Sequence, residues 1–283
     1  MQKLYKSGKA LLKEVFETKL MDHTIAFWSL GQAGVLIKED KQDGWICIDP
    51  YLTAIIEEAD QQSEFKRAFP PVIEPALLKN IDGVLVTHDH GDHLDLATLK
   101  ELDQVTEQTC LIVPAPCEAS VYKEVEQMKL HLAKADEPFT IKGFSITPVP
   151  AAHTEYDVDE NNDHAFLGYF IEVNGVKLYH SGDTVVTPLL VEKVKAFNPD
   201  VAFLPINGGD YFRTSRGIIG NMSFREAADF SAAVGADLVI PIHFDMFPNN
   251  RDNPAYFVDY LFHHYPAQKF HMMVPGERFI YHK

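Results

Sequence analysis

The stretch Thr87-His88-Asp89-His90-Gly91-Asp92-His93-Leu94-Asp95 contains three histidines and three aspartates in nine residues, directly after an apolar segment. Because adjacent imidazoles and carboxylates are costly to desolvate without cations, this cluster predicts a metal centre. His88 and His90 are two positions apart on extended chain and can point to the same side. Asp92 and His93 follow where a helix begins and are displaced from that pair. The spacing therefore favours two metal ions that share one site.

Further residues of ligand type stand where other apolar segments end. They are Asp49, His153, His180, Asp183 and His243. Since the ends of parallel strands meet at one rim of a sheet, we expect these side chains to gather there. Taken alone, Asp183 could be a turn residue, and His153 and His243 could be core histidines. Together with the cluster they divide into two predicted metal sites: His88, His90 and His153 form the first, Asp92, His93 and His243 form the second, and Asp183 is shared.

Around the cluster, short apolar segments of strand character alternate with helical patterns. Strands are predicted at 25–30, 35–38, 45–48, 83–86, 111–113, 144–149, 165–173, 176–180, 201–204, 238–242 and 278–281. Helices are predicted at 1–20, from Asp95, at 118–128, from Thr187, from Ser223 to Gly235, and at 256–263. Residues 54–80 interrupt this rhythm as an insertion or cap would. The order predicts an α/β fold with two sheets covered by helices on their outer faces.

Three local signals support these boundaries. Asn174-Gly175 lies between two strand patterns, and both residues accept positive φ, which predicts a hairpin. Ser223 with Glu226 forms a capping box, and Gly235 can end the helix that follows. The helix near the N-terminus has one apolar side, which indicates packing on the domain or on a neighbouring subunit.

Composition narrows the partners. The 283 residues are 46% hydrophobic, with no run of about 20 uncharged apolar residues, so we expect a soluble protein with no membrane partner. A formal charge of −16 repels phosphate backbones, and no nucleic-acid partner is expected. Three cysteines without Cys-x-x-Cys spacing indicate neither a disulfide framework nor a zinc knuckle, and a cytoplasmic location is expected.

The order of these metal-binding elements resembles the metallo-β-lactamase superfamily: His-x-His-x-Asp-His, then a separate His, a Gly-Asp and a final His. Within it, the chain is similar to the L-ascorbate-6-phosphate lactonase group. The similar segments are Ala26-Phe-Trp-Ser-Leu-Gly-Gln-Ala-Gly-Val, the His-Asp cluster, Leu178-Tyr-His-Ser-Gly-Asp, Arg216-Gly-Ile, Asn221-Met-Ser and Val239-Ile-Pro-Ile-His-Phe-Asp. The chain departs from that group in offering His153, in a shorter 54–80 segment and in a shorter C-terminus.

The resemblance implies a four-layer αββα sandwich and a binuclear metal hydrolase. We expect a helical extension at 1–22 and one hydrolase domain at 23–283. Two divalent ions could lower the pKa of a shared water and present hydroxide to a carbonyl or phosphoryl centre, with Asp92 as the catalytic residue that orients it. The resemblance implies Mn²⁺, whereas the ligand chemistry favours Zn²⁺, and Fe²⁺ also suits it.

Other residues have expected roles around the metals. Asp49 is interpreted as a carboxylate that orients a histidine ligand, and His180 either as another such group or as a packed strand residue. Arg216 is the expected contact for an anionic group of the substrate, with Asn207 and Tyr211 as weaker candidates.

The expected function is hydrolysis of a small anionic substrate, with a sugar-acid phosphate lactone as the specific candidate and a homo-oligomer as the expected assembly. A phosphodiesterase or nuclease of the same superfamily is one alternative. A non-catalytic metal-binding protein is another, although structural zinc sites usually close at four ligands on one ion.

Overall fold

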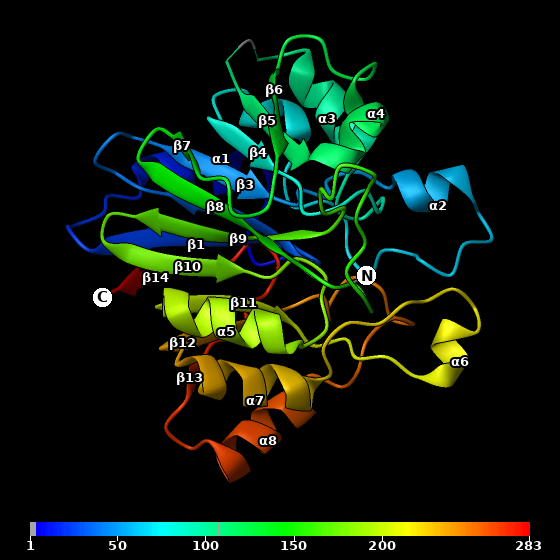
Figure 1. Cartoon of the computed structure of the whole chain (residues 1–283). Coiled ribbons are helices and arrows are strands. Elements are labelled where there is room, and N and C mark those ends of the chain that lie inside the picture. The colour runs from blue at the N-terminus through cyan, green and yellow to red at the C-terminus, as the bar shows by residue number, and fades with distance from the viewer. Residues whose placement is uncertain (1–3, 107) are drawn as a thin grey trace.

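The computed structural model describes residues 4–106 and 108–283, which form two seven-stranded sheets packed face to face (Figure 1). Helices cover the outer face of each sheet. The predicted α/β fold with four αββα layers is therefore confirmed.

The first sheet pairs the first strand of the chain with the last one. Its strands, in spatial order, are β14 (Arg278–His282), β1 (Thr24–Gly31), β2 (Gly34–Lys38), β3 (Trp45–Ile48), β4 (Gly83–Leu85), β5 (Cys110–Pro114) and β6 (Lys129–Ala133). From β3 to β6 all neighbours pair in parallel, so the carboxyl ends of β3 and β4 meet at one rim.

The second sheet brings three more strand ends to the metal-ligand residues. Its strands, in spatial order, are β13 (Lys269–Phe270), β12 (Leu238–Ile242), β11 (Val201–Pro205), β10 (Val176–His180), β9 (Leu167–Val173), β8 (Phe144–Pro150) and β7 (Phe139–Ile141). β8 and β10 are both antiparallel to β9, and β12 runs parallel to β11 and so to β10. The strands that precede His153, Asp183 and His243 therefore point the same way.

Alternation along single strands explains the layers. In β1, Ile25 and Phe27 enter the core between the sheets, whereas Ala26 and Trp28 face the helical layer. Because successive side chains leave a strand on opposite faces, a strand that is apolar at every position is buried on both.

Seven helices cover the sheets or lie near the predicted ligands. They are α1 (Gly8–Glu17), α2 (Ile55–Ala59), α3 (Leu96–Asp103), α5 (Pro188–Phe197), α6 (Tyr211–Thr214), α7 (Phe224–Val234) and α8 (Ala255–His264). The predicted caps are confirmed: Thr187 accepts the Leu190 N–H at 3.1 Å, Ser223 forms its capping box, and Gly235 ends α7 at φ 75°.

α1 is shorter than the predicted helix at 1–20, of which residues 1–3 lie outside the described residues. Its buried Leu11 and Val15 pack in the same apolar cluster as Trp28. The buried Lys38 ammonium donates to the carbonyls of Val15 at 3.0 Å and Thr18 at 3.1 Å, which satisfies the end of the helix.

The predicted helix at 118–128 is wrong. The chain forms only η2 (Ala115–Cys117) and α4 (Glu118–Val121), then turns into β6, a strand the sequence analysis missed. Asp103 stabilises the turn before β6, because its carboxylate accepts the backbone N–H groups of residues 126, 127 and 128 at 2.8–2.9 Å. These three N–H groups are then no longer available to donate to the carbonyls of a helix.

The segment 54–80 contains α2 and η1 (Pro75–Leu78). It is tied to the loop after β12 by the Ala68 N–H, which donates to the Met246 carbonyl at 2.9 Å. In Figure 1, α2 and α6 project at the same end of the molecule, beyond the strand ends.

Within the described residues, no helix has both the length and the apolar character needed to cross a membrane.

Candidate metal centre

The predicted ligands come together at the rim where the two sheets meet. One ligand atom each from His88, His90 and Asp183 lies within 4.8 Å of the others, and the same holds for Asp92, His93 and His243. We call these sets the first and the second triad. The first triad combines the loop after β4 with the end of β10, and the second combines the same loop with the end of β12, so each triad takes ligands from both sheets.

His153 lies beside the first triad. Its ring centroid is 5.1 Å from that of His90 and 5.9 Å from that of His88. Nδ1 is hydrogen-bonded to Asn221 Oδ1 at 2.8 Å, which leaves Nε2 for a metal ion. Phe166 packs on this imidazole with a centroid separation of 5.3 Å.

Asp183 reaches both triads. Besides its place in the first, its Oδ1 lies 3.4 Å from His93 Nε2 and its Oδ2 lies 3.3 Å from His243 Nε2. The carboxylate is buried, with 4% of the residue exposed. Asp183 therefore lies within reach of ligand atoms of both triads.

Unsatisfied atoms show that the residues fit a cation. His88 Nε2, His93 Nε2 and Asp183 Oδ1 are buried and have no hydrogen-bond partner among the described residues. Leaving such atoms unpaired is costly, and imidazole nitrogens with carboxylate oxygens are the donors that divalent transition metals prefer. The donor set thus fits divalent metal ions.

The electrostatics of the site also favour cations. Burial lowers the pKa of His88 well below its ordinary value, which keeps the imidazole in its ligand form. Burial opposes ionisation of Asp183, yet His243 and His93 hold its pKa well below the usual range. Against the effect of burial, Asp183 and Asp92 raise the pKa of His243 to about 10. This negative potential is what a divalent cation would neutralise.

Asp49 is hydrogen-bonded to one of the predicted ligands, His93. Its Oδ2 accepts from His93 Nδ1 at 2.8 Å and from Thr87 Oγ1 at 2.7 Å, and its Oδ1 accepts the Thr87 N–H at 2.8 Å. His93 is left with Nε2 facing the site. His180 instead bonds backbone groups with both ring nitrogens, the Ala33 carbonyl at 2.9 Å and the Gly182 N–H at 3.2 Å, and is a packed strand residue.

Gln32 is a site residue that sequence reasoning missed. Its Nε2 donates to Asp92 Oδ2 at 2.7 Å and lies 3.0 Å from His243 Nε2. Its backbone also binds the loop after β12: the carbonyl accepts the His243 N–H at 2.8 Å, and the N–H donates to Asp245 Oδ1 at 2.9 Å. A sequence signal that could have found it is Leu-Gly-Gln-Ala-Gly between two predicted strands, which indicates a turn. In the structure, Gln32 lies in this turn with φ 57°.

A pocket of about 340 Å³ opens over the triads. Five predicted ligands form part of its lining: His90, Asp92, His153, Asp183 and His243. The rest includes Ile56 and Phe65 from the 54–80 segment, which therefore forms one wall of the site.

The three expected substrate contacts do not point into this pocket. Arg216 is half exposed and donates to Glu64 Oε2 at 2.8 Å, and the Tyr211 side chain on α6 is 78% exposed. Asn207 is fully buried behind the pocket wall, where its Nδ2 donates to Asn250 Oδ1 at 3.2 Å.

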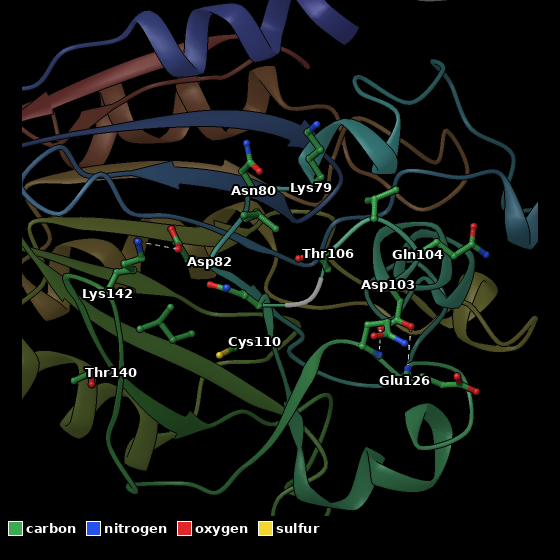
Figure 2. Close-up of a pocket in the computed structure, with 15 residues that line it drawn as sticks. Lys79, Asn80, Asp82, Asp103, Gln104, Thr106, Cys110, Glu126, Thr140 and Lys142 are labelled. Carbon is green, nitrogen blue, oxygen red and sulfur yellow. Dashed lines mark hydrogen bonds and ion pairs between the residues drawn. The ribbon is translucent and has the colours of Figure 1, made fainter.

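A larger cavity, of about 1060 Å³, lies at the other end of β4 and β5 (Figure 2). Three of its charged side chains pair within the protein: Lys142 Nζ lies 3.4 Å from Asp82 Oδ1, and Asp103 holds the turn before β6. None of the predicted site residues lines it. The chemistry therefore belongs to the smaller pocket.

Residues 44–244 match the family model described as the β-lactamase superfamily domain. The chain belongs to the metallo-β-lactamase superfamily. A UPF0173 metal-dependent hydrolase of Pyrococcus horikoshii is 30% identical over 229 residues, which are 81% of this chain and 88% of the relative. A probable L-ascorbate-6-phosphate lactonase, UlaG, of Escherichia coli is 24% identical over 278 residues, covering 87% of this chain and 77% of the relative.

Solved structures share the fold of this superfamily member. The metallo hydrolase Igni18 of Ignicoccus hospitalis has a TM-score of 0.66 and 22% identity, covering 92% of this chain and 99% of that one. YhfI of Bacillus subtilis, a metallo-β-lactamase fold protein, has a TM-score of 0.68 and 16% identity, with coverages of 92% and 100%.

Proposed function

We propose that this superfamily member is a metal-dependent hydrolase that opens small esters or lactones with two divalent ions. Asp183 carries the proposal, because its two oxygens lie 3.4 Å and 3.3 Å from ligand nitrogens of the second triad while it also belongs to the first. The first ion would be held by His88, His90 and His153, the second by Asp92, His93 and His243, and both by Asp183.

When bound, the two ions would lower the pKa of a water and polarise the bond to be broken. Gln32 Nε2 donates to Asp92 Oδ2 at 2.7 Å, so the other oxygen of Asp92 would be available to orient that water and take its proton. His93 and His243 keep the pKa of Asp92 low in spite of burial, so this carboxylate is ionised. In the overall reaction water adds to the carbonyl carbon, the acyl C–O bond breaks, the alcohol oxygen takes a proton and an acid is formed.

The identity of the ions is part of the proposal. A donor set of imidazoles and carboxylates suits Zn²⁺, Mn²⁺ and Fe²⁺. Similarity to the lactonases supports Mn²⁺, and the large share of histidine supports Zn²⁺.

The finer expectation of a sugar-acid phosphate lactone is supported by the name of the Escherichia coli relative, at 24% identity. The salt bridge from Arg216 to Glu64 leaves that arginine less suited to bind a phosphate. We therefore propose a lactone or ester without making the phosphate a requirement.

We further propose that the protein is cytoplasmic, forms a homo-oligomer and has no nucleic-acid partner. The formal charge of −16 supports the last of these.

The test starts from protein stripped of metal and reloaded with Mn²⁺ or Zn²⁺. We expect about two ions per chain by elemental analysis, and hydrolysis of members of a lactone and ester panel by the reloaded protein. His243→Ala should lose metal and activity together, whereas His263→Ala, an exposed histidine on α8, should lose neither. Full activity after exhaustive chelation, or no hydrolysis by protein that holds two ions, would overturn the proposal.

A further inference from the structure

The wall of the metal pocket is apolar apart from one amide. Besides the ligand residues, the pocket is lined by Ile56, Phe65, Ile219, Asn250 and two glycines. No lysine or arginine occurs in this lining among residues 4–106 and 108–283. A group that reaches beyond the ligand residues would therefore meet hydrocarbon and a single neutral hydrogen-bonding side chain.

The apolar wall is held firmly. Phe65 packs edge to face on Phe247, with ring centroids 5.4 Å apart, and Phe247 belongs to the buried cluster that includes Tyr51 and Phe69. Rearranging this wall to admit a charged group would expose that cluster.

Three arginines of the segments that flank the pocket do not line it and bind other groups of the protein. Arg67 donates to the carbonyls of Tyr51, Thr53 and Phe69 at 2.9–3.2 Å. Arg213 is buried and is bonded to Asp210, to the Asn207 carbonyl and to Asp252. Arg216 pairs with Glu64. Among the described residues, a phosphate or carboxylate in the pocket would thus meet no lysine or arginine in the lining itself.

Asn250 contributes the one side-chain amide of the pocket lining. Its Oδ1 accepts from Asn207 Nδ2 at 3.2 Å. Asn207 is fully buried and is itself held, because its carbonyl accepts from Arg213 Nη1 at 2.8 Å and its backbone bridges to that of Ser223. With its oxygen engaged, Asn250 has its amide N–H₂ group left for a ligand.

We infer that the pocket selects an uncharged lactone or ester, whose apolar body packs on Ile56, Phe65 and Ile219 and whose acceptor oxygen binds the Asn250 amide. This inference rests on the proposed hydrolase function and specifies its substrate class. Asn250 is then a specificity-determining residue that contacts the substrate, and Asn207 is a positioning residue behind it.

The test uses matched pairs of ligands on metal-loaded protein. Each pair is a lactone with a short alkyl tail and the same lactone with a terminal phosphate. The corresponding five-membered lactams, whose unstrained amides resist hydrolysis, serve as probes of binding. We expect at least tenfold higher kcat/KM for the uncharged lactone and tighter binding of the uncharged lactam by calorimetry. Asn250→Leu should lower both by about tenfold, roughly the factor of one neutral hydrogen bond, with metal content unchanged. Asn207→Leu should also weaken binding of the uncharged lactam, because Asn250 would lose the hydrogen bond that Asn207 donates to it.

A change of charge in the wall provides the opposite test. Ile219→Lys should reduce or reverse the preference for the uncharged ligand. Ile280→Lys, at an exposed position of strand β14, should leave this preference unchanged. Tighter binding of the phosphorylated lactam to the unmodified protein, or no effect of Asn250→Leu, overturns the inference. If no lactone is hydrolysed and the uncharged lactam still binds more tightly through Asn250, the proposed reaction fails and the pocket assignment stands.

Discussion

A site with two metal ions would depend more on Asp183 than on any other residue. This aspartate follows Ser-Gly at the end of β10, is buried, and lies within 3.4 Å of ligand nitrogens on His93 and His243. A carboxylate between two cations reduces their mutual repulsion, so its charge matters to both sites.

Asp183→Asn keeps the shape of the side chain and removes its charge. We expect weaker binding of both ions and a kcat lowered by orders of magnitude, with the far-UV circular dichroism unchanged. Titration with Mn²⁺ or Zn²⁺ followed by elemental analysis measures the first effect. His153→Ala is the comparison, because it should weaken mainly the first ion. Two tightly bound ions and near-normal turnover in Asp183→Asn would show that the two ions do not share this residue.

At the scale of elements, a salt bridge joins the two segments that flank the pocket. Arg216, just after α6, donates to Glu64 Oε2 at 2.8 Å, and Asn249 donates to the same oxygen at 3.2 Å. Glu64 belongs to the 54–80 segment, and the neighbour of Arg216, Gly217, lines the pocket. The pair therefore links the 54–80 segment to the segment after α6.

Arg216→Gln and Glu64→Gln should have matching effects if the pair only links these segments. Both side chains are more than 40% exposed, so the coupling free energy should be about 0.2–1 kcal/mol in a double-mutant cycle and should fall at high salt. KM should change by the same factor for phosphorylated and unphosphorylated lactones. If Arg216→Gln raised KM only for phosphorylated substrates while Glu64→Gln did not, Arg216 would be the anion contact that the sequence suggested.

At the scale of the whole molecule, the metal site connects the two sheets. His88 and His93 follow β4 of the first sheet, whereas Asp183 and His243 follow β10 and β12 of the second. Ions bound by both sets of residues stabilise the folded chain and not the unfolded one.

Removal of metal should therefore destabilise the fold. Saturation at 1,000 times Kd adds about 4 kcal/mol per site, and each kcal/mol is worth about 2–4 °C in domains of roughly this size. We expect chelation to lower Tm by about 10 °C or more in differential scanning fluorimetry. His243→Ala should show a smaller drop and His263→Ala the full one. A wild-type Tm that does not respond to chelation would contradict a metal site shared by the two sheets.

The sequence by itself determined the local features of the fold. The Ser223 capping box, the Gly235 helix end and the Asn174-Gly175 hairpin depend on neighbours a few residues apart, and all three are found. The sequence also determined that His and Asp residues follow the apolar strands, because the ends of strands can be located from the pattern of apolar residues alone. The αββα layers followed from the order of those patterns and from the resemblance they carried.

Only the tertiary structure decided which distant residues meet. Gln32 lies 60 positions from Asp92, Asn221 lies 68 from His153, and Asn250 lies 43 from Asn207. No local pattern marks such pairs, since their contacts are set by how two sheets bury their shared faces and bring loops to one rim. The same reason explains why the sequence did not reveal the partner of Arg216. Its charge is plain in the sequence, but Glu64 is 152 positions away and meets it only because two separate loops pack together.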